Sequence, residues 1–206
     1  MSTVAIVDYG MCNLDSVRRA VEECGGRSVV VTNDPAQVAA AGHIILPGVG
    51  AFPDAMRQLR ERGLDKSLYE QVVVEGAPFL GICLGMQLLA AVGFEGGPTE
   101  GLGWIDAAVR RLTPTAQDRQ VPHVGWNEVV PHGDSPLFDG IEPASDFYFV
   151  HSYHVVCASE DDVAATTPYC GGFTSAVGHG NVHAVQFHPE KSQRVGLRLL
   201  RNFLDQ

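Results

Sequence analysis

The stretch FLGICLGMQLLA, residues 79–90, changes from a strand-like to a helix-like pattern at a single cysteine. Its apolar first half predicts a buried strand over 78–83, and the residues after Cys83 predict a helix over 84–92. Gly81 and Gly85 flank the cysteine, so the strand would enter the helix through a tight turn. Cys83 is therefore either a nucleophile held at this turn or a small buried residue that fills it.

The same alternation runs through the first ninety residues. Strands are predicted at 3–10, 27–34 and 43–50, and helices at 13–26, 34–42, 52–63 and 64–76. Gly25 favours the end of the first helix, and Asp34 with Pro35 favours the start of the second. Continuous apolar strands alternating with helices predict an α/β fold: a doubly wound, mostly parallel central sheet flanked by helices.

The second half of the chain is richer in strands. Short strands separated by Gly, Pro and Asp turns are predicted at 103–114, 126–131, 146–156, 163–169, 173–180 and 181–190. An amphipathic helix is predicted over 192–204. With 206 residues and neither a repeat nor a linker, we expect one domain spanning 1–206.

The composition narrows the classes of function. The formal net charge is -10, which argues against binding to nucleic acids or anionic membranes. The apolar runs are too short for a signal peptide or a spanning helix. Five cysteines without a CxxC pair predict free thiols, a cytoplasmic location and no metal site.

The segment from Gly81 to Gly85 has the layout of a G-x-S-x-G nucleophile elbow, with cysteine in place of serine. Cys83 would lie at a helix N-terminus, where the helix dipole and free amides favour a thiolate. The amide of Leu84 would point toward a developing oxyanion.

A base and an orienting carboxylate occur together in AVQFHPE, residues 184–190. In an extended segment His188 and Glu190 project to the same face, so the carboxylate would hold the imidazole in one tautomer. A solvated His and Glu in a surface turn is the alternative. Together with the elbow, the pair predicts a Cys–His–Glu triad formed by Cys83, His188 and Glu190.

These residues resemble a known family. GICLGMQLL (81–89) and FHPEKS (187–192) are similar to the class I, triad-type glutamine amidotransferases. Four further segments resemble the glutaminase subunits of imidazole glycerol phosphate synthase, an enzyme of histidine biosynthesis: DYGMCNLDSV (8–17), LPGVGAF (46–52), PHVGWNEV (122–129) and FYFVHSYH (147–154). The resemblance covers essentially the whole chain, in order.

The resemblance implies roles for particular positions. Cys83 would attack the glutamine carboxamide to form a thioester, His188 would transfer protons, and Glu190 would orient His188. The implied oxyanion donors are the amides of Leu84 and of Val49 or Gly50, and the implied substrate contacts are Gly50, Gln87, His151, Ser152 and Tyr153. Gln87 could instead be an exposed helix residue, but its i+4 spacing puts it on the face of Cys83. No cofactor is implied.

Ammonia released by such a site must be kept from protonation, which is a physical reason for a partner that receives it directly. The resemblance implies a heterodimer with a (β/α)8-barrel cyclase, which would use the ammonia to form imidazole glycerol phosphate. The implied interface residues are Asn13, Trp126, Tyr148 and Lys191. Their alternative roles are a helix N-cap for Asn13, core aromatics for Trp126 and Tyr148, and a solvated charge for Lys191.

One position departs from the family. Members of the family have the sequence DYGxGN, whereas this chain has Cys12 in place of the second glycine. A non-glycine residue disfavours positive φ, so the sequence predicts an altered loop and a less certain contact through Asn13. Cys12 lacks a base nearby in sequence, and we do not expect it to be a second reactive thiol.

Two other functions remain open at this point. One is the glutaminase of anthranilate or aminodeoxychorismate synthase, against which PHVGWNEV and DYGMCNLDSV argue. The other is a non-catalytic, flavodoxin-like module that only docks to a barrel, against which the complete set of Cys83, His188 and Glu190 argues.

Overall fold

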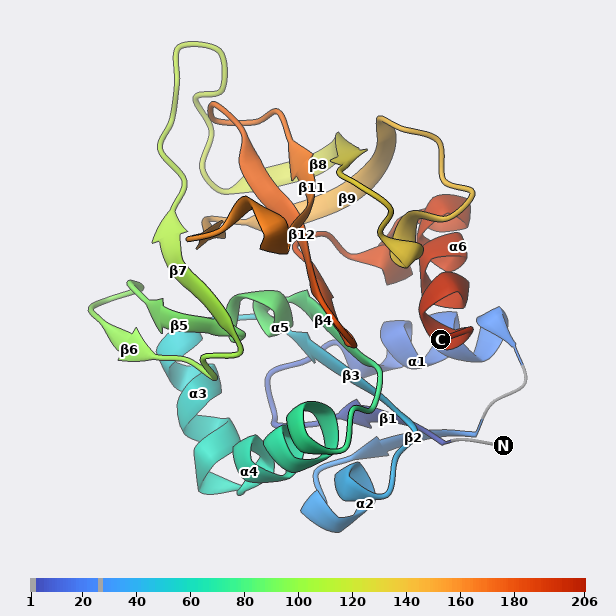
Figure 1. Cartoon of the computed structure of the whole chain (residues 1–206). Coiled ribbons are helices and arrows are strands. Elements are labelled where there is room, and N and C mark those ends of the chain that lie inside the picture. Colours follow the sequence, from blue (N-terminus) through green and yellow to red (C-terminus); the bar gives the residue numbers. More distant parts are fainter. Residues whose placement is uncertain (1–2, 26–27) are drawn as a thin grey trace.

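The computed structural model describes residues 3–25 and 28–206 (Figure 1). The helices are α1 (Leu14–Cys24), α2 (Pro35–Ala39), α3 (Phe52–Glu61), α4 (Leu64–Leu68), η1 (Tyr69–Val74), α5 (Leu84–Gln87), η2 (Pro136–Phe138), η3 (Glu160–Asp162), η4 (Pro189–Lys191) and α6 (Gln193–Leu204). The strands are β1 (Val4–Val7), β2 (Val29–Thr32), β3 (His43–Gly48), β4 (Phe79–Cys83), β5 (Ala90–Gly93), β6 (Thr99–Glu100), β7 (Ile105–Arg111), β8 (His123–Pro131), β9 (Ser145–His151), β10 (Tyr153–Cys157), β11 (Val163–Thr167), β12 (Phe173–His179) and β13 (Val182–Val185).

The sheet is parallel where the first half of the chain builds it. Strands β2, β1, β3, β4 and β13 lie in that order, and each neighbouring pair is parallel. Beyond β13 the strands β12, β10 and β7 pair antiparallel, and β5 then runs parallel to β7. A ribbon of β8 and β9 is joined to this sheet through β11. The predicted α/β class, with a strand-rich second half, is confirmed.

Strand β1 shows why helices cover both faces of the sheet. Ala5 and Val7 pack into a buried cluster with residues of α2, α3 and α4, while Val4 and Ile6 pack into a second cluster with residues of α1 and α6. Figure 1 shows α1 beside α6, and α2 beside α4. Because side chains of a strand alternate between faces, a strand apolar at every position fits only this double covering.

The predicted helix over 84–92 is wrong beyond its first turn. Helix α5 ends at Gln87, and Ala90–Gly93 form β5 instead. The carbonyl of Leu88 accepts from the amide of Leu102, and the carbonyl of Leu89 accepts from the amide of Trp104. A longer helix would use these carbonyls internally, so pairing with a distant segment overrides the local preference.

The predicted helix over 64–76 forms, but with a wider turn. After α4 the chain continues as η1, a π-helix, in which the amide of Glu75 donates to the carbonyl of Glu70. The side-chain amide of Asn181 donates to the carbonyls of Val72 and Ala77. A residue more than one hundred positions away therefore stabilises the end of this helix, which the local sequence does not reveal.

The single strand predicted over 146–156 is two strands that separate at Ser152. Strand β9 pairs with β8, whereas β10 pairs with β7 and β12. Residues 26 and 27, at the ends of a predicted helix and strand, lie outside the described residues. In residues 3–25 and 28–206, no helix combines the length and apolar character needed to cross a membrane.

Candidate active site

Cys83 stands at the junction of β4 and α5 with a backbone that non-glycine residues rarely adopt. Its φ is 55° and its ψ is -108°. Such strain persists only where the surrounding structure enforces it, and it clusters at functional sites. The backbone therefore has the strained elbow conformation that the sequence predicts, although α5 supplies a single turn of helix dipole rather than a long one.

Both glycines of the elbow are required by close backbone approach. A Cβ on Gly85 would collide with the carbonyl oxygen of Leu46 on β3, and a Cβ on Gly81 would lie 2.8 Å from the carbonyl oxygen of Gly85. The turn thus packs directly on the neighbouring strand, which holds Cys83 at the carboxyl edge of the parallel sheet.

A cavity of about 350 Å³ opens in front of this edge. Its lining comes from separate parts of the chain: Val49, Gly50, Cys83, Leu84, Gln87, Glu95, Pro122, Val150, His151, Ser152 and Tyr153. The predicted nucleophile, oxyanion loop and substrate contacts thus meet at one cavity. Its volume lies within the range of small-molecule sites.

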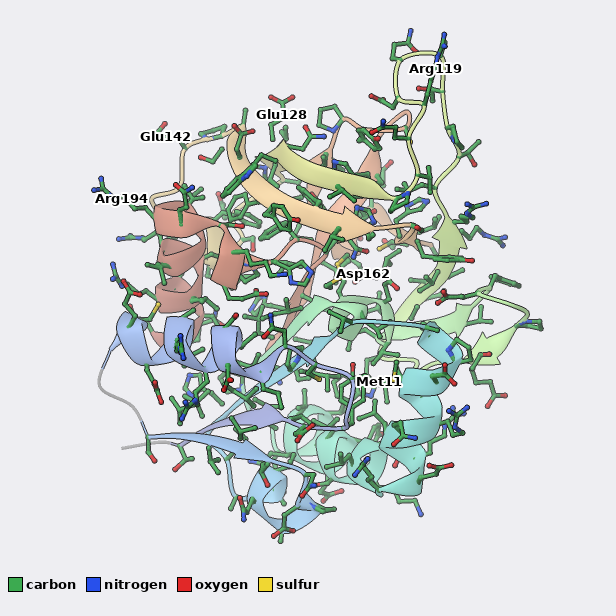
Figure 2. The ribbon with its side chains drawn as sticks, turned by 180° about the vertical axis from the view of Figure 1, so that it is seen from behind. Met11, Arg119, Glu128, Glu142, Asp162 and Arg194 are labelled. Carbon is green, nitrogen blue, oxygen red and sulfur yellow. The ribbon has the colours of Figure 1, made fainter. Side chains whose placement is uncertain are left out.

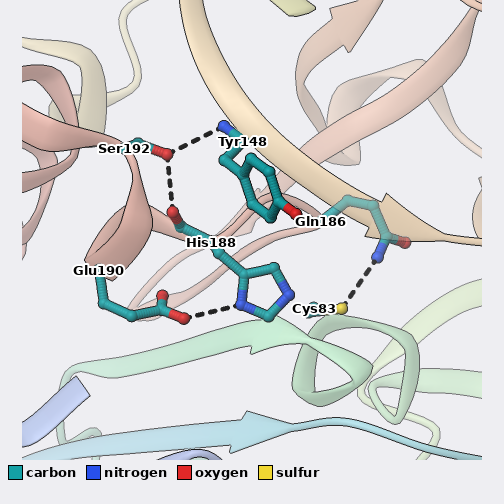
Figure 3. A network of polar contacts seen from close by, with 6 residues as sticks. All are labelled: Cys83, Tyr148, Gln186, His188, Glu190 and Ser192. Atoms are coloured by element: carbon teal, nitrogen blue, oxygen red, sulfur yellow. Dashed lines mark hydrogen bonds and ion pairs between the residues drawn. The ribbon is translucent and has the colours of Figure 1, made fainter. Parts of the chain in front are cut away.

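His188 and Glu190 lie beside Cys83 and are not among the residues that line the cavity (Figure 3). The His188 Nδ1 is 2.7 Å from the Glu190 Oε1, and the two side chains are 4% and 1% exposed. The alternative of a solvated surface pair is therefore excluded. Nε2 of His188 is buried without a hydrogen-bond partner, and Figure 3 shows the ring between Glu190 and Cys83.

The electrostatics of His188 favour its protonated form. Burial alone lowers the pKa of His188, but the sulfur of Cys83 and the carboxylate of Glu190 outweigh burial and raise the pKa above its ordinary value. An imidazolium at this position would stabilise a thiolate on Cys83.

The backbone of His188 is fixed by two neighbours. Its amide donates to the carbonyl of Tyr148 at 2.9 Å, and its carbonyl accepts from the Ser192 hydroxyl at 2.6 Å. The same hydroxyl accepts from the amide of Tyr148 at 3.0 Å. Ser192 is fully buried, so this small network leaves the imidazole little freedom (Figure 3).

The two predicted oxyanion donors differ in whether their N–H groups are already engaged in a hydrogen bond. Leu84 begins α5, so its N–H has no partner within the helix. The amide of Val49 donates to the carbonyl of Met11 at 2.8 Å and is thereby engaged elsewhere. Gly50 follows with a φ of 104°, and a Cβ there would lie 2.7 Å from the Met11 side chain.

Three of the predicted substrate contacts, Gln87, His151 and Tyr153, are joined by hydrogen bonds. The side chain of Gln87, predicted to be either a contact or an exposed residue, is buried, and its Nε2 lies 3.0 Å from the carbonyl of Tyr153. The same carbonyl is 2.8 Å from Nδ1 of His151, whose Nε2 is 3.1 Å from Nδ1 of His123. Burial lowers the pKa of His151 to about 3 and that of His123 to about 4, so both rings are neutral.

Three of the predicted interface residues form one surface cluster. The rings of Trp126 and Tyr148 are 6.0 Å apart, and the Lys191 ammonium lies 5.6 Å from the Tyr148 ring. Trp126 is 47% exposed, so it is not a core aromatic. Asn13 is at the N-cap position of α1 but makes no side-chain capping bond, and it borders a narrow crevice with Val49 and His188.

Cys12 fits its loop without positive φ. Its thiol lies 3.2 Å from the carbonyl of Pro47, inside the turn that precedes Val49. Burial raises the pKa of Cys12 to about 12, which opposes a role as a second reactive thiol.

Three residues near the site are missing from the sequence prediction. Gln186 lies 3.6 Å from Cys83 through its Nε2, Ser192 holds the backbone of His188, and Glu95 lines the cavity. The predicted strand over 181–190 is wrong beyond Val185, because residues 186–188 leave β13 and Glu190 lies in η4, so strand alternation does not place Gln186. Ser192 and Glu95 carry no local signal either.

No group of three or more His, Cys, Asp or Glu side chains in the described part of the chain is arranged to hold a metal ion. The five cysteines are free thiols.

Comparisons with solved structures support the fold. A crystal structure of a glutamine amidotransferase matches with a TM-score of 0.75 at 22% identity, covering 98% of this chain and 97% of that one. The structure of PurLQS from Thermotoga maritima matches with a TM-score of 0.72 at 19% identity, covering 100% of this chain and 99% of that one. At these identities the likeness concerns the fold alone.

Sequence comparisons are more specific. The chain is 47% identical to imidazole glycerol phosphate synthase subunit HisH 2 of Nitrobacter winogradskyi, covering 99% of this chain and 98% of that protein. It is 48% identical to imidazole glycerol phosphate synthase subunit HisH of Moorella thermoacetica, covering 98% of this chain and 94% of that protein. The model of the glutamine amidotransferase class-I family matches residues 5–206. With the elbow, the cavity and these matches together, the chain belongs to the class-I glutamine amidotransferase family and, within it, to the HisH subunits of imidazole glycerol phosphate synthase.

Proposed function

We propose that this chain hydrolyses glutamine to glutamate and ammonia as the glutaminase subunit of imidazole glycerol phosphate synthase. The observation that carries the proposal is the strained Cys83, which opens on a cavity and lies beside the buried His188–Glu190 pair. The match to HisH subunits over nearly the whole chain supports the same assignment.

In the proposed mechanism the thiolate of Cys83 attacks the carboxamide carbon of glutamine. His188, held as a proton donor by Glu190, protonates the departing nitrogen so that ammonia leaves and a thioester remains. His188 then takes a proton from water, which attacks the thioester carbonyl and releases glutamate while the sulfur regains its negative charge. The sequence of steps uses no cofactor and no metal.

Both tetrahedral intermediates carry an oxyanion that needs donors. We assign the Leu84 amide as one donor and an amide of the Val49–Gly50 turn as the second. Because the Val49 amide donates to Met11 in this structure, its use would require that bond to break. Losing one such donor lowers turnover by about 10²–10³-fold.

The cavity suits the two ends of free glutamine. Glu95 is the acidic side chain among its lining residues, and its Oε2 is held by the amide of Phe52 at 2.8 Å. A fixed carboxylate there would pair with the α-ammonium group of the substrate. Gly50, Gln87, His151, Ser152 and Tyr153 are assigned to the remainder of the substrate.

The face beside the cavity suits a partner subunit. Val124 pairs with Val150 and Trp126 pairs with Tyr148 in the β8–β9 register, which puts the four side chains on one side of the ribbon. Val124, Trp126 and Val150 are 58%, 47% and 37% exposed. Exposed apolar surface next to a site that releases ammonia supports a heterodimer with a (β/α)8-barrel cyclase, with Asn13, Trp126, Tyr148 and Lys191 at the interface.

Figure 2 shows this ribbon from behind, with Glu128 labelled beside β8 near the upper edge and Met11 labelled below the ribbon. We further propose that residues 1–206 act as one glutamine amidotransferase domain in the cytoplasm. The continuous sheet supports the first point, and the free thiols support the second.

The test is glutamine hydrolysis by the wild type and by Cys83→Ala, with and without the cyclase. We expect turnover in the complex and its loss in the variant. Unchanged hydrolysis by Cys83→Ala would refute the triad and favour a module that only docks. Stimulation by the partner chain of anthranilate or aminodeoxychorismate synthase, but not by the cyclase, would instead assign this chain as a subunit of one of those enzymes.

A further inference from the structure

Gln186 joins the nucleophile to a residue of the proposed substrate site. Its side chain is fully buried behind Cys83. Its Nε2 donates to the sulfur of Cys83 at 3.6 Å, and its Oε1 accepts from Nε2 of Gln87 at 3.0 Å. Figure 3 shows the Gln186 amide and the His188 ring on different sides of the sulfur.

The orientation of these two amides is fixed by a backbone carbonyl. The carbonyl of Tyr153 can only accept, so Gln87 must present its nitrogen to it. The same nitrogen contacts Gln186, which must therefore present its oxygen to Gln87 and its nitrogen to Cys83. Both N–H groups of Gln87 are then used, and its oxygen is left as an acceptor at the cavity that Gln87 lines.

We propose that Gln186 is a positioning residue for glutamine hydrolysis, a role that rests on the proposed function of Cys83. Its N–H stabilises and aims the thiolate from the side away from His188. Its carbonyl holds the Gln87 amide so that the Gln87 oxygen faces the substrate as an acceptor and binds hydrogen-bond donors. One buried amide thus couples the reactivity of the nucleophile to the recognition of a carboxamide or ammonium group.

Two isosteric variants separate the parts of this role. Gln186→Glu keeps an acceptor for Gln87 but replaces the donor at the sulfur with an oxygen of a carboxylate. Gln186→Met keeps the volume and removes both hydrogen bonds. Gln71→Met is the matched control, because Gln71 also donates from a partly buried side chain to a backbone carbonyl, that of Ala41, outside the site.

The first readout is the pH dependence of Cys83 alkylation by iodoacetamide, followed by mass spectrometry of the Cys83 peptide. We expect Gln186→Glu to move the midpoint upward by about one pH unit or more, because a like charge faces the thiolate. Gln186→Met should move it upward by less, and Gln71→Met should leave it unchanged. Loss of packing alone would not give this order, and thermal unfolding of each variant shows that the profiles belong to folded protein.

The second readout is steady-state glutamine hydrolysis in the complex with the cyclase. Gln186→Met should raise KM about tenfold or more, since the Gln87 amide is no longer held. If Gln186 acts through Gln87, the double variant Gln186→Met/Gln87→Met should have a KM close to that of Gln87→Met alone.

Wild-type alkylation profiles in both Gln186 variants, or KM effects that multiply in the double variant, would overturn the proposal. This failure is distinguishable from failure of the proposed function. If only the role of Gln186 is wrong, Cys83→Ala still abolishes hydrolysis. If the proposed function of Cys83 is wrong, Cys83→Ala does not abolish it.

Discussion

At Cys83 a single residue combines a strained backbone with the side chain proposed as the nucleophile. Its positive φ is enforced by a turn that packs against β3 with no room for a side chain at position 85. The strain thus depends on glycines that take no part in the chemistry. We expect the stability of the fold and the geometry of the nucleophile to be inseparable at this point.

Replacing Gly85 with alanine tests this close approach. The new Cβ would collide with the Leu46 carbonyl, so we expect a loss of unfolding free energy above about 4 kcal/mol, or no folded protein. Gly133→Ala is the control, because Gly133 has a positive φ of 60° but open space around its Cβ. It should lose roughly 1–2 kcal/mol. Equal losses in urea unfolding would contradict the steric explanation.

His151 predicts how stability depends on pH. The folded pKa of about 3 lies below the ordinary value of 6.5, so the unfolded chain binds a proton that the folded chain does not. Stability should therefore fall as pH falls from 6.5 toward 3, by about 1.4 kcal/mol per pH unit for this one group.

The measurement compares urea unfolding at pH 7 and pH 5 for the wild type and for His151→Asn. The variant should lose roughly 2 kcal/mol less over this interval. His179→Asn removes a histidine whose side chain is 74% exposed and serves as the control. Parallel losses in the wild type and His151→Asn would show that His151 does not titrate as the structure implies.

The residues of the site differ in how far the sequence reveals them. Cys83 follows from a local turn pattern, whereas the strand alternation used for His188 and Glu190 is wrong, because β13 ends at Val185 and Glu190 reaches His188 from η4. The burial of Gln87 depends on Tyr153 and Gln186, which only the folded sheet brings beside it. The engagement of the Val49 amide by Met11 depends likewise on two separate loops. Local chemistry is readable in the sequence, whereas these partners are not.

Among the elements, the strands and helices of the first half follow most directly from the sequence. Asp34 accepts from the amide of Ala36 and Pro35 begins α2, as their capping preferences predict. The prediction fails at Leu88 and Leu89, whose carbonyls are bonded to residues 102–105, and at Ser152, where a strand changes partner. In each case a long-range hydrogen bond decides between two locally acceptable structures.

The η1 helix gives a prediction at this scale. Asn181→Ala removes two hydrogen bonds to carbonyls at the end of η1, and we expect a loss of about 2 kcal/mol of unfolding free energy. Hydrogen exchange should increase within residues 69–77. Asn202→Ala also removes two such bonds, to Leu137 and Asp139, and should raise exchange near η2 instead. Unchanged exchange at η1 in Asn181→Ala would refute the dependence.

Across the whole molecule, the parallel half of the sheet carries Cys83, the proposed nucleophile, and the strand-rich half carries the surface proposed to meet a partner. The cavity lies where the two halves meet, because its lining comes from the ends of β3 and β4 and from residues beside β9 and β10. In the proposed mechanism, ammonia would form at Cys83 and be released beside the exposed apolar side of the β8–β9 ribbon.

Trp126→Ala tests this arrangement. We expect the Kd for the cyclase to rise at least fivefold, since a half-exposed tryptophan at an interface contributes more than about 1 kcal/mol, while the thermal stability of the isolated chain stays nearly unchanged. Val73→Ala, at a 44% exposed valine on η1, is the control. Equal Kd values for the two variants in titration calorimetry would contradict an interface at the β8–β9 ribbon.

The bonds between Tyr148 and His188 have a mechanical consequence. The side chain of Tyr148 lies on the outer surface with Trp126, while its main chain holds the backbone of His188 directly and through Ser192. A displacement of β9 at this surface would therefore be passed to the backbone of His188, the residue proposed to transfer protons, through these hydrogen bonds. Under the proposed mechanism, a partner bound at Trp126 and Tyr148 would thus be linked to the imidazole by three hydrogen bonds.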